Sequence, residues 1–350
     1  MGPPWVAGPG FSREAISGDV ITMLNSTRNV FVSLCAGAAL AAGGAAIADD
    51  RGDWPRSITV GTASQGGTYF IYGSGWANMV GEALDINAGA EVTGGPVQNA
   101  TLVQTGDHQF GMVTMGPALA AWEGESELAP GLEHKDIRAV FPMYQTAFQV
   151  IALSGSGIES VADLDGKTVG IGPAGGTADM YWPQFFEQLG LDVRTRNGGA
   201  SDQVGQLQDG LIDAFAFAAG IPISAFSQAE AQADVNIFSI AEADQEAILE
   251  AFPELVGSSV PGDAYQSLDA DIPAISIWNF AITHKDMPES LVYGVTKTVM
   301  ENNDEMVQIH GASKETLPEN WEVNDWLPFH PGAVRWFEEN GFDIPDDLRG

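Results

Sequence analysis

The chain has 350 residues, of which 45% are hydrophobic, 47 are acidic and 14 are basic, giving a formal net charge of −33. The hydrophobic fraction excludes a largely disordered chain, and the length suffices for two domains. A surface this acidic repels nucleic acid and anionic lipid, so we expect neither as a partner. The acidic surplus fits either adaptation to concentrated salt or an ordinary acidic protein.

Cysteine and histidine are too sparse to form a disulfide framework or a metal motif. The single cysteine is Cys35, which excludes an intrachain disulfide and a cysteine-based zinc site. The histidines are scattered and no pair has the spacing of a helical metal motif: His108, His134, His284, His310 and His330. We therefore expect no metal and no cofactor.

An apolar, uncharged run occupies residues 30–48, after Arg28 and before two aspartates. A basic flank, an apolar centre and the small-residue end Ala46-Ile47-Ala48 are typical of a secretory signal peptide. An uncleaved transmembrane anchor is the alternative, but alanine and glycine insert weakly into a bilayer. We therefore expect cleavage near Ala48 and a periplasmic or otherwise extracytoplasmic mature protein.

Residues 1–22 are rich in proline and glycine and precede the basic flank, so Met23 is an alternative translation start. We treat residues 1–48 as an N-terminal extension plus the secretory signal peptide. This segment is left out of the predicted fold.

In the mature chain, strands, glycine loops and helices follow one another in a repeated order. The first part predicts strands at 57–60, 90–92 and 110–113, with helices that open near Thr68 and at Pro96. The pattern restarts later, with strands at 168–171, 191–194 and 212–218 and helices at 177–189 and 201–207. Such alternation indicates parallel sheets covered by helices, in two α/β lobes built alike.

Two extended apolar segments, 141–153 and 272–283, are suited to bridge the lobes. Lobe one then comprises residues 56–146 and 280–350, completed by helices at 289–300 and 331–340. Lobe two comprises residues 147–279.

The glycine loops at 61–68 and 172–177 each lie between a strand and a helix, and each ends in Gly-Gly-Thr. Such a loop presents backbone N–H groups at the positive end of the helix dipole, which favours an anion. A tight turn between a strand and a helix requires glycine even where no ligand binds, so either loop taken singly can be explained by its turn alone. Neither loop matches a nucleotide-binding motif, and no nucleophile elbow is present.

Six segments of the mature chain follow one another in the order of a known pattern. The first runs from Ile58-Thr59-Val60-Gly61-Thr62 to Gly66-Gly67-Thr68-Tyr69-Phe70. The others, in chain order, are Thr93-Gly94-Gly95-Pro96-Val97-Gln98-Asn99, Gly172 to Thr177, Asp209 to Ala214, Gly220-Ile221-Pro222 and Phe329 to Gly341. Together these segments resemble the TAXI-type solute receptors of TRAP transporters, and the resemblance covers residues 57–343, nearly the whole mature chain.

The resemblance implies a two-lobed periplasmic-binding-protein fold of type II-like form, with two extended hinge segments. It implies a monomeric solute receptor and no enzyme. A small organic anion (a dicarboxylate, a glutamate-like acid or a 2-oxoacid) would bind in the interlobe cleft and pass to TRAP membrane permease subunits. The alternatives are a secreted ligand-binding sensor module and an enzyme on the same scaffold.

The expected ligand-binding residues come from the loops, the strand ends and the bridges. They are Ser64, Gly66, Gly67, Thr68, Tyr69, Thr93, Gly94, Gly95, Pro96, Asn99, Thr114, Met115, Gln149, Gly175, Gly176, Thr177, Gly220 and Asn279. For Asn99 we favour a bond to loop backbone over a contact with ligand. Pro96 replaces a serine of the resembled family, so the pocket should be less polar. The candidates for a charge clamp on a carboxylate are Arg138, Arg194 and Arg196, although for Arg194 and Arg196 we favour solvent exposure. We expect His330 to open a helix.

Overall fold

The computed structural model describes residues 51–350, so the predicted signal peptide, its cleavage site and the alternative start lie outside the described residues. Two separate hydrophobic cores divide these residues into two lobes, named lobe one and lobe two. None of the helices within the described range has the length and apolar character needed to cross a membrane.

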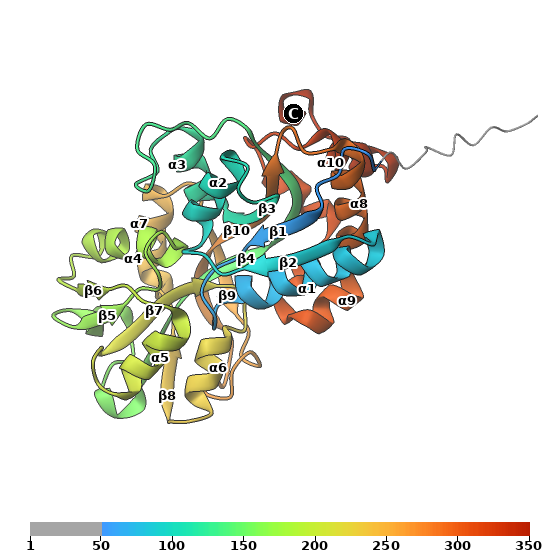
Figure 1. The fold of residues 1–350 in the computed structure, drawn as a ribbon. Coiled ribbons are helices and arrows are strands. Elements are labelled where there is room, and N and C mark those ends of the chain that lie inside the picture. The colour runs from blue at the N-terminus through green and yellow to red at the C-terminus, as the bar shows by residue number, and fades with distance from the viewer. Residues whose placement is uncertain (1–50) are drawn as a thin grey trace, which may run out of the picture. The chain divides into compact units, whose positions relative to one another are not determined.

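Lobe one is built from both ends of the described chain (Figure 1). Its strands are β1 (Ser57–Gly61), β2 (Asn87–Glu91) and β3 (Phe110–Thr114). Its helices are α1 (Thr68–Leu84), α2 (Pro96–Gln104), α3 (Met115–Trp122), α8 (Glu289–Met300), α9 (Asn303–Ile309) and α10 (Pro331–Glu339).

Lobe two is built from the middle of the chain. Its strands are β5 (Thr168–Gly170), β6 (Arg194–Arg196), β7 (Ala214–Ala219), β8 (Val235–Phe238) and β9 (Val256–Val260). Its helices are α4 (Thr177–Gln188), α5 (Ala200–Gln208), α6 (Ser224–Glu230) and α7 (Glu242–Ala251). Short 3-10 helices occur in both lobes. They are η1 (Ser154–Ser156), η2 (Val161–Leu164), η3 (Gly311–Glu315), η4 (Pro318–Val323) and η5 (Asp346–Leu348).

Two long strands, β4 (Ile137–Leu153) and β10 (Ile272–His284), run through both lobes. The sheet follows the order β2-β1-β3-β10-β4-β7-β5-β6, with β8 against β4 and β9 against β10. The β1–β2, β1–β3, β5–β6 and β5–β7 pairs are parallel, whereas β4 and β10 are antiparallel to their neighbours. The fold is therefore α/β with two lobes joined by two extended strands, as the sequence predicted.

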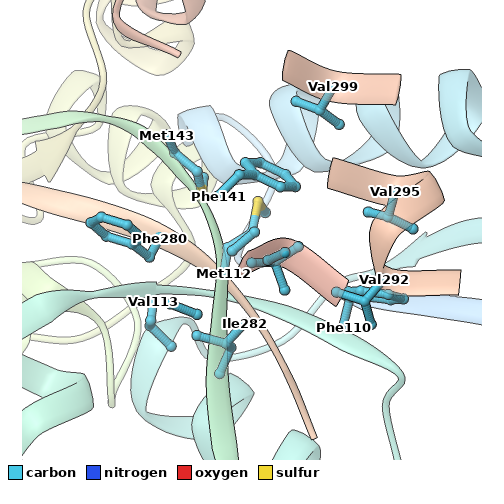
Figure 2. Packing of buried hydrophobic residues seen from close by; sticks show 14 of the residues in the cluster. Phe110, Met112, Val113, Phe141, Met143, Phe280, Ile282, Val292, Val295 and Val299 are labelled. Carbon is cyan, nitrogen blue, oxygen red and sulfur yellow. The ribbon is translucent and has the colours of Figure 1, made fainter. Parts of the chain in front are cut away.

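The core of lobe one forms because one face of α8 is apolar at helical spacing. Figure 2 shows Val292, Val295 and Val299 of this helix beside the buried side chains Phe110 and Phe141 of the sheet. Residues at i, i+3 and i+7 share one side of a helix, which explains this contact. Lobe two has its own core, in which Phe148 packs edge-on against Tyr181, Trp182 and Phe185 of α4. Phe148 and Trp182 are thus core residues.

Two predicted strands are displaced. The strand predicted at 191–194 is wrong, because β6 covers Arg194–Arg196. Leu191 instead caps the preceding helix, its N–H donating to the Phe186 carbonyl at 2.9 Å after Gly190 at φ 70°. The strand predicted at 90–92 corresponds to β2, which begins earlier, at Asn87.

Candidate functional site

A small cavity of about 30 Å³ lies between the glycine loops of the two lobes. Its walls include the residues that open three helices, namely Gly67 and Thr68 at α1, Gly95 and Pro96 at α2, and Gly176 and Thr177 at α4. In all three helices the N-cap is a glycine without a side-chain cap. No capping side chain therefore occupies the first-turn N–H groups of α1 and α4. At α2, Pro96 has no N–H, and the Val97 N–H donates to the Gly175 carbonyl at 3.4 Å.

The loops of the two lobes are in direct contact across this cavity. The Thr68 hydroxyl donates to the Gly220 carbonyl at 2.6 Å, and the hydroxyls of Thr114 and Thr177 are 2.9 Å apart. The cavity has room for about one water molecule, far less than a typical ligand pocket of at least ~300 Å³. The lobes are therefore closed on one another, and a ligand can enter only if they separate.

A second group of contacts holds the loop after β1 against α5 and α6. The Ser64 hydroxyl accepts from the Ala200 N–H at 3.2 Å, at the start of α5. The Gly66 carbonyl accepts from the Ala225 N–H at 3.0 Å. Gly66 has φ 88°, a conformation that favours glycine, so the turn itself requires this residue.

Tyr69 and Thr146 form the hinge side of the cavity, and both bond to Asn279, which lies outside the wall. The Tyr69 hydroxyl donates to Asn279 Oδ1 at 2.7 Å, and Asn279 Nδ2 donates to the Thr146 hydroxyl at 2.9 Å. The same amide also donates to the Tyr144 carbonyl, where the β4–β10 register shifts. Burial raises the pKa of the Tyr69 phenol well above its usual value, so the group stays neutral and donates. Asn279 therefore connects the hinge strands to α1.

Three predicted residues stabilise the loops from behind. Asn99 is fully buried, and its Nδ2 donates to the carbonyls of Thr62 at 2.7 Å and Met112 at 2.8 Å. The Thr93 hydroxyl donates to Asn99 Oδ1 at 2.7 Å. The carbonyl of Gly175 accepts from the Val97 N–H at 3.4 Å, across the lobes. The structural role favoured for Asn99 agrees with these contacts.

Eight of the predicted residues line the cavity: Gly67, Thr68, Tyr69, Gly94, Gly95, Pro96, Gly176 and Thr177. The other predicted residues lie outside its wall. Gln149 is fully buried in lobe two, where its amide atoms have no hydrogen-bond partner among the described residues. Met115 is buried at the start of α3, and Gly220 contributes only its carbonyl, through the bond from Thr68.

Six residues that sequence reasoning missed complete the wall: Ala63, Thr146, Pro173, Phe217, Ala218 and Ala219. Ala63 and Pro173 belong to the glycine loops already singled out. The last three end strand β7, and the carboxyl ends of strands are where α/β proteins usually bind ligands. That rule could have identified them.

The cavity wall contains no charged side chain. The three candidates for a charge clamp do not line the cavity: Arg194 and Arg196 are exposed on β6, and the half-buried Arg138 donates to the carbonyls of Lys135 and Ile137 at 2.8 Å. His330 is the N-cap of α10, where its Nδ1 accepts from the Gly332 N–H. Within residues 51–350, no group of three or more His, Cys, Asp or Glu side chains is placed to hold a metal ion.

Comparisons with known proteins agree with this architecture. The periplasmic binding protein BugD has 15% identity and a TM-score of 0.54, over 83% of this chain and 99% of its own. MatC from Rhodopseudomonas palustris, solved with bound malate, has 13% identity and a TM-score of 0.52, over 81% of this chain and 99% of its own. These likenesses show a shared two-lobed fold. The model of the NMT1-like family matches residues 60–341, and the chain therefore belongs to that family.

Proposed function

We propose that this protein is an extracytoplasmic receptor that binds a small organic anion between its lobes and delivers it to a membrane transporter. The observation that carries the proposal is the convergence of three helix starts, from both lobes, on one cavity. Backbone N–H groups and the positive ends of the helix dipoles favour an anion at that point. The family and the fold support the receptor class.

The net charge of −33 does not oppose anion binding at this site. No carboxylate lines the cavity, so the nearest electrostatic groups are backbone dipoles and threonine hydroxyls. Dissolved salt screens the acidic surface over about 10 Å at 0.1 M, whereas dipoles in contact with a ligand are screened far less. The sign of the charge that this site prefers in a ligand is therefore set by the groups in contact with the ligand.

The closed arrangement supplies the switch that a receptor needs. The bonds Thr68–Gly220 and Thr114–Thr177 join the lobes when no ligand lies between them, and a ligand larger than the cavity would replace these bonds with its own contacts to both lobes. Such a ligand binds the closed form better than the open one and so shifts the population. We propose that the receptor is a monomer and that a membrane permease of the TRAP type recognises its closed form. A sensor protein would bind its ligand and close in the same way. Uptake of the ligand by the reconstituted receptor and permease would distinguish transport from sensing.

The test is binding of small acids by the purified protein and by Gly67→Val and Gly176→Val. Both glycines have φ values that valine can adopt, −89° and −83°, and both line the cavity. A Cβ at Gly67 makes ordinary contacts at 3.4–3.5 Å, whereas a Cβ at Gly176 stands 3.0 Å from the Pro173 carbonyl, so Gly67→Val is the cleaner of the two variants. Gly89→Val is the matched control, because a side chain at this exposed position on β2 meets nothing within 4 Å. We expect the control to bind normally and the cavity variants to lose binding. Normal binding by all three refutes the site.

A further inference from the structure

A second and larger cavity lies against the hinge strands β4 and β10, and we call it the hinge cavity. Its volume of about 590 Å³ lies within the ~300–1,000 Å³ of ordinary ligand pockets. Lobe one contributes η3, and lobe two contributes β9 with the turn that follows it. Gln145 of β4 and Ser276 of β10 also line the hinge cavity. A molecule bound here would therefore touch both lobes.

The hinge cavity is separate from the small cavity between the glycine loops. Gln145 lines the hinge cavity, whereas its neighbour Thr146 lines the small one. Successive side chains of a strand point to opposite faces, so the two cavities lie on opposite faces of β4. No residue lines both cavities. The hinge cavity is thus a place for a different ligand.

Three charged side chains line the hinge cavity: Lys314 and Glu315 of lobe one, and Asp263 of lobe two. None of the three takes part in an ion pair within residues 51–350. Lys314 is exposed, and its long flexible side chain can keep the ammonium group in solvent. The two carboxylates therefore favour a cation in the hinge cavity. The net charge of −33 also attracts cations toward the protein.

Glu315 is the carboxylate that gains most from a cationic partner. Its side chain is half-buried, and its Oε2 accepts from the Gln145 N–H at 2.7 Å. Its Oε1 has a longer contact, of 3.4 Å, with the Gln145 side-chain nitrogen. Burial raises the pKa of Glu315, because the charged form has lost part of its hydration. An ammonium group beside Oε1 would replace that hydration with a charge-assisted hydrogen bond.

We propose that the hinge cavity binds a small aliphatic diamine, with one ammonium group at Glu315 of lobe one and the other at Asp263 of lobe two. A molecule with a single ammonium group pairs with only one of these carboxylates, so it binds less tightly. The proposal is independent of the proposed function, because the two sites share no residue.

The first experiment measures binding to the purified protein by calorimetry. The probes are propane-1,3-diamine, butane-1,4-diamine, pentane-1,5-diamine and butan-1-amine. We expect one diamine to bind with a stoichiometry of one per chain, at least about tenfold more tightly than butan-1-amine. Adsorption of cations over the whole acidic surface would have no fixed stoichiometry, and that result overturns the proposal. Equal binding of all four probes, or no binding by the folded protein, also overturns it.

The second experiment tests the two carboxylates with matched controls. Glu315→Gln keeps an oxygen that can accept from the Gln145 N–H, so this variant should fold. We expect diamine affinity to fall about tenfold in Glu315→Gln and about fivefold in the more exposed Asp263→Asn. The controls Glu319→Gln and Asp269→Asn each remove an exposed carboxylate that lies nearby in the sequence but outside the cavity wall, and both should bind as the parent does.

Equal affinity in all four variants refutes the site. A further variant separates this proposal from the proposed function. Gly67→Val, which alters only the small cavity, should bind the diamine as the parent does. If Gly67→Val loses diamine binding while Glu315→Gln keeps it, the diamine binds between the glycine loops and the hinge cavity is not its site.

Discussion

A methyl group at position 116 should hold the lobes apart. Gly116 lies in α3 of lobe one and faces Tyr181, on α4 of lobe two. A Cβ atom at Gly116 would overlap the Tyr181 hydroxyl oxygen and stand 3.0 Å from its Cζ. The ring cannot swing away cheaply, because it packs against Phe148 and Phe252, and its hydroxyl donates to Glu254 at 2.7 Å.

The magnitude follows from the cost of overpacking. Inserting a methyl group into a filled contact costs about 1–3 kcal/mol. In Gly116→Ala this cost falls on the closed form alone, so the free energy of closure becomes less favourable by the same amount. The dissociation constant of a ligand bound in the closed form should then rise about 5–150-fold.

The assay combines two measurements. Calorimetry gives the dissociation constant, and small-angle scattering gives the radius of gyration of the ligand-free protein, which increases when the lobes separate. Gly116→Ala should have a larger radius of gyration than the parent protein and weaker binding. Tyr181→Phe removes the overlapping oxygen, so the double variant Gly116→Ala/Tyr181→Phe should regain most of both properties. Tyr181→Phe alone loses about 1 kcal/mol with its hydrogen bond to Glu254 and should keep a closed form. If Gly116→Ala matches the parent in size and affinity, the lobes do not meet at this contact.

Three further predictions concern stability. Burial lowers the pKa of His330 to about 4, below the 6.5 of a free histidine. The unfolded chain takes up the proton first, so the free energy of unfolding should fall by up to roughly 3 kcal/mol between pH 6.5 and 4 in urea titrations. His330→Asn, which keeps a helix cap, should flatten that fall. Asn99→Ala should cost about 2–4 kcal/mol in the same assay, because it leaves buried partners unpaired; a loss below 1 kcal/mol would contradict this. Raising sodium chloride from 0.1 to 1 M should raise the melting temperature, because the screening length shrinks from about 10 to 3 Å; an unchanged melting temperature would show that charge repulsion is minor.

The helix starts and glycine loops could be predicted because their signals are local. Thr68 follows Gly-Gly and precedes an amphipathic run, and Pro96 marks the first residue of its helix. The displaced strand at 191–194 shows where local patterns fail, since Leu191 completes a helix cap before β6 begins. Its apolar side chain gave no sign of that hydrogen bond.

The cavity wall was harder to predict than the loops, because contacts between the lobes leave no periodic signal. In the sequence, Phe217 cannot be told from an ordinary core residue of a buried strand. Its position between Gly67 and Gly172, where it lines the cavity, could be seen only in three dimensions. Asn279 was singled out as a polar residue on a bridge. Its bonds to Tyr69 and Thr146 could be seen only in three dimensions.

The strand order has a consequence for synthesis. β10 lies between β3 and β4, so the sheet of lobe one is incomplete until residue 284 has been made. A nascent chain that stops before β10 leaves β3 with an unpaired edge and lacks Phe280 and Ile282 of the core. Lobe one therefore cannot fold ahead of lobe two, although it contains the first strand of the described chain. Premature termination anywhere before β10 should yield a chain with an exposed sheet edge, open to degradation and aggregation.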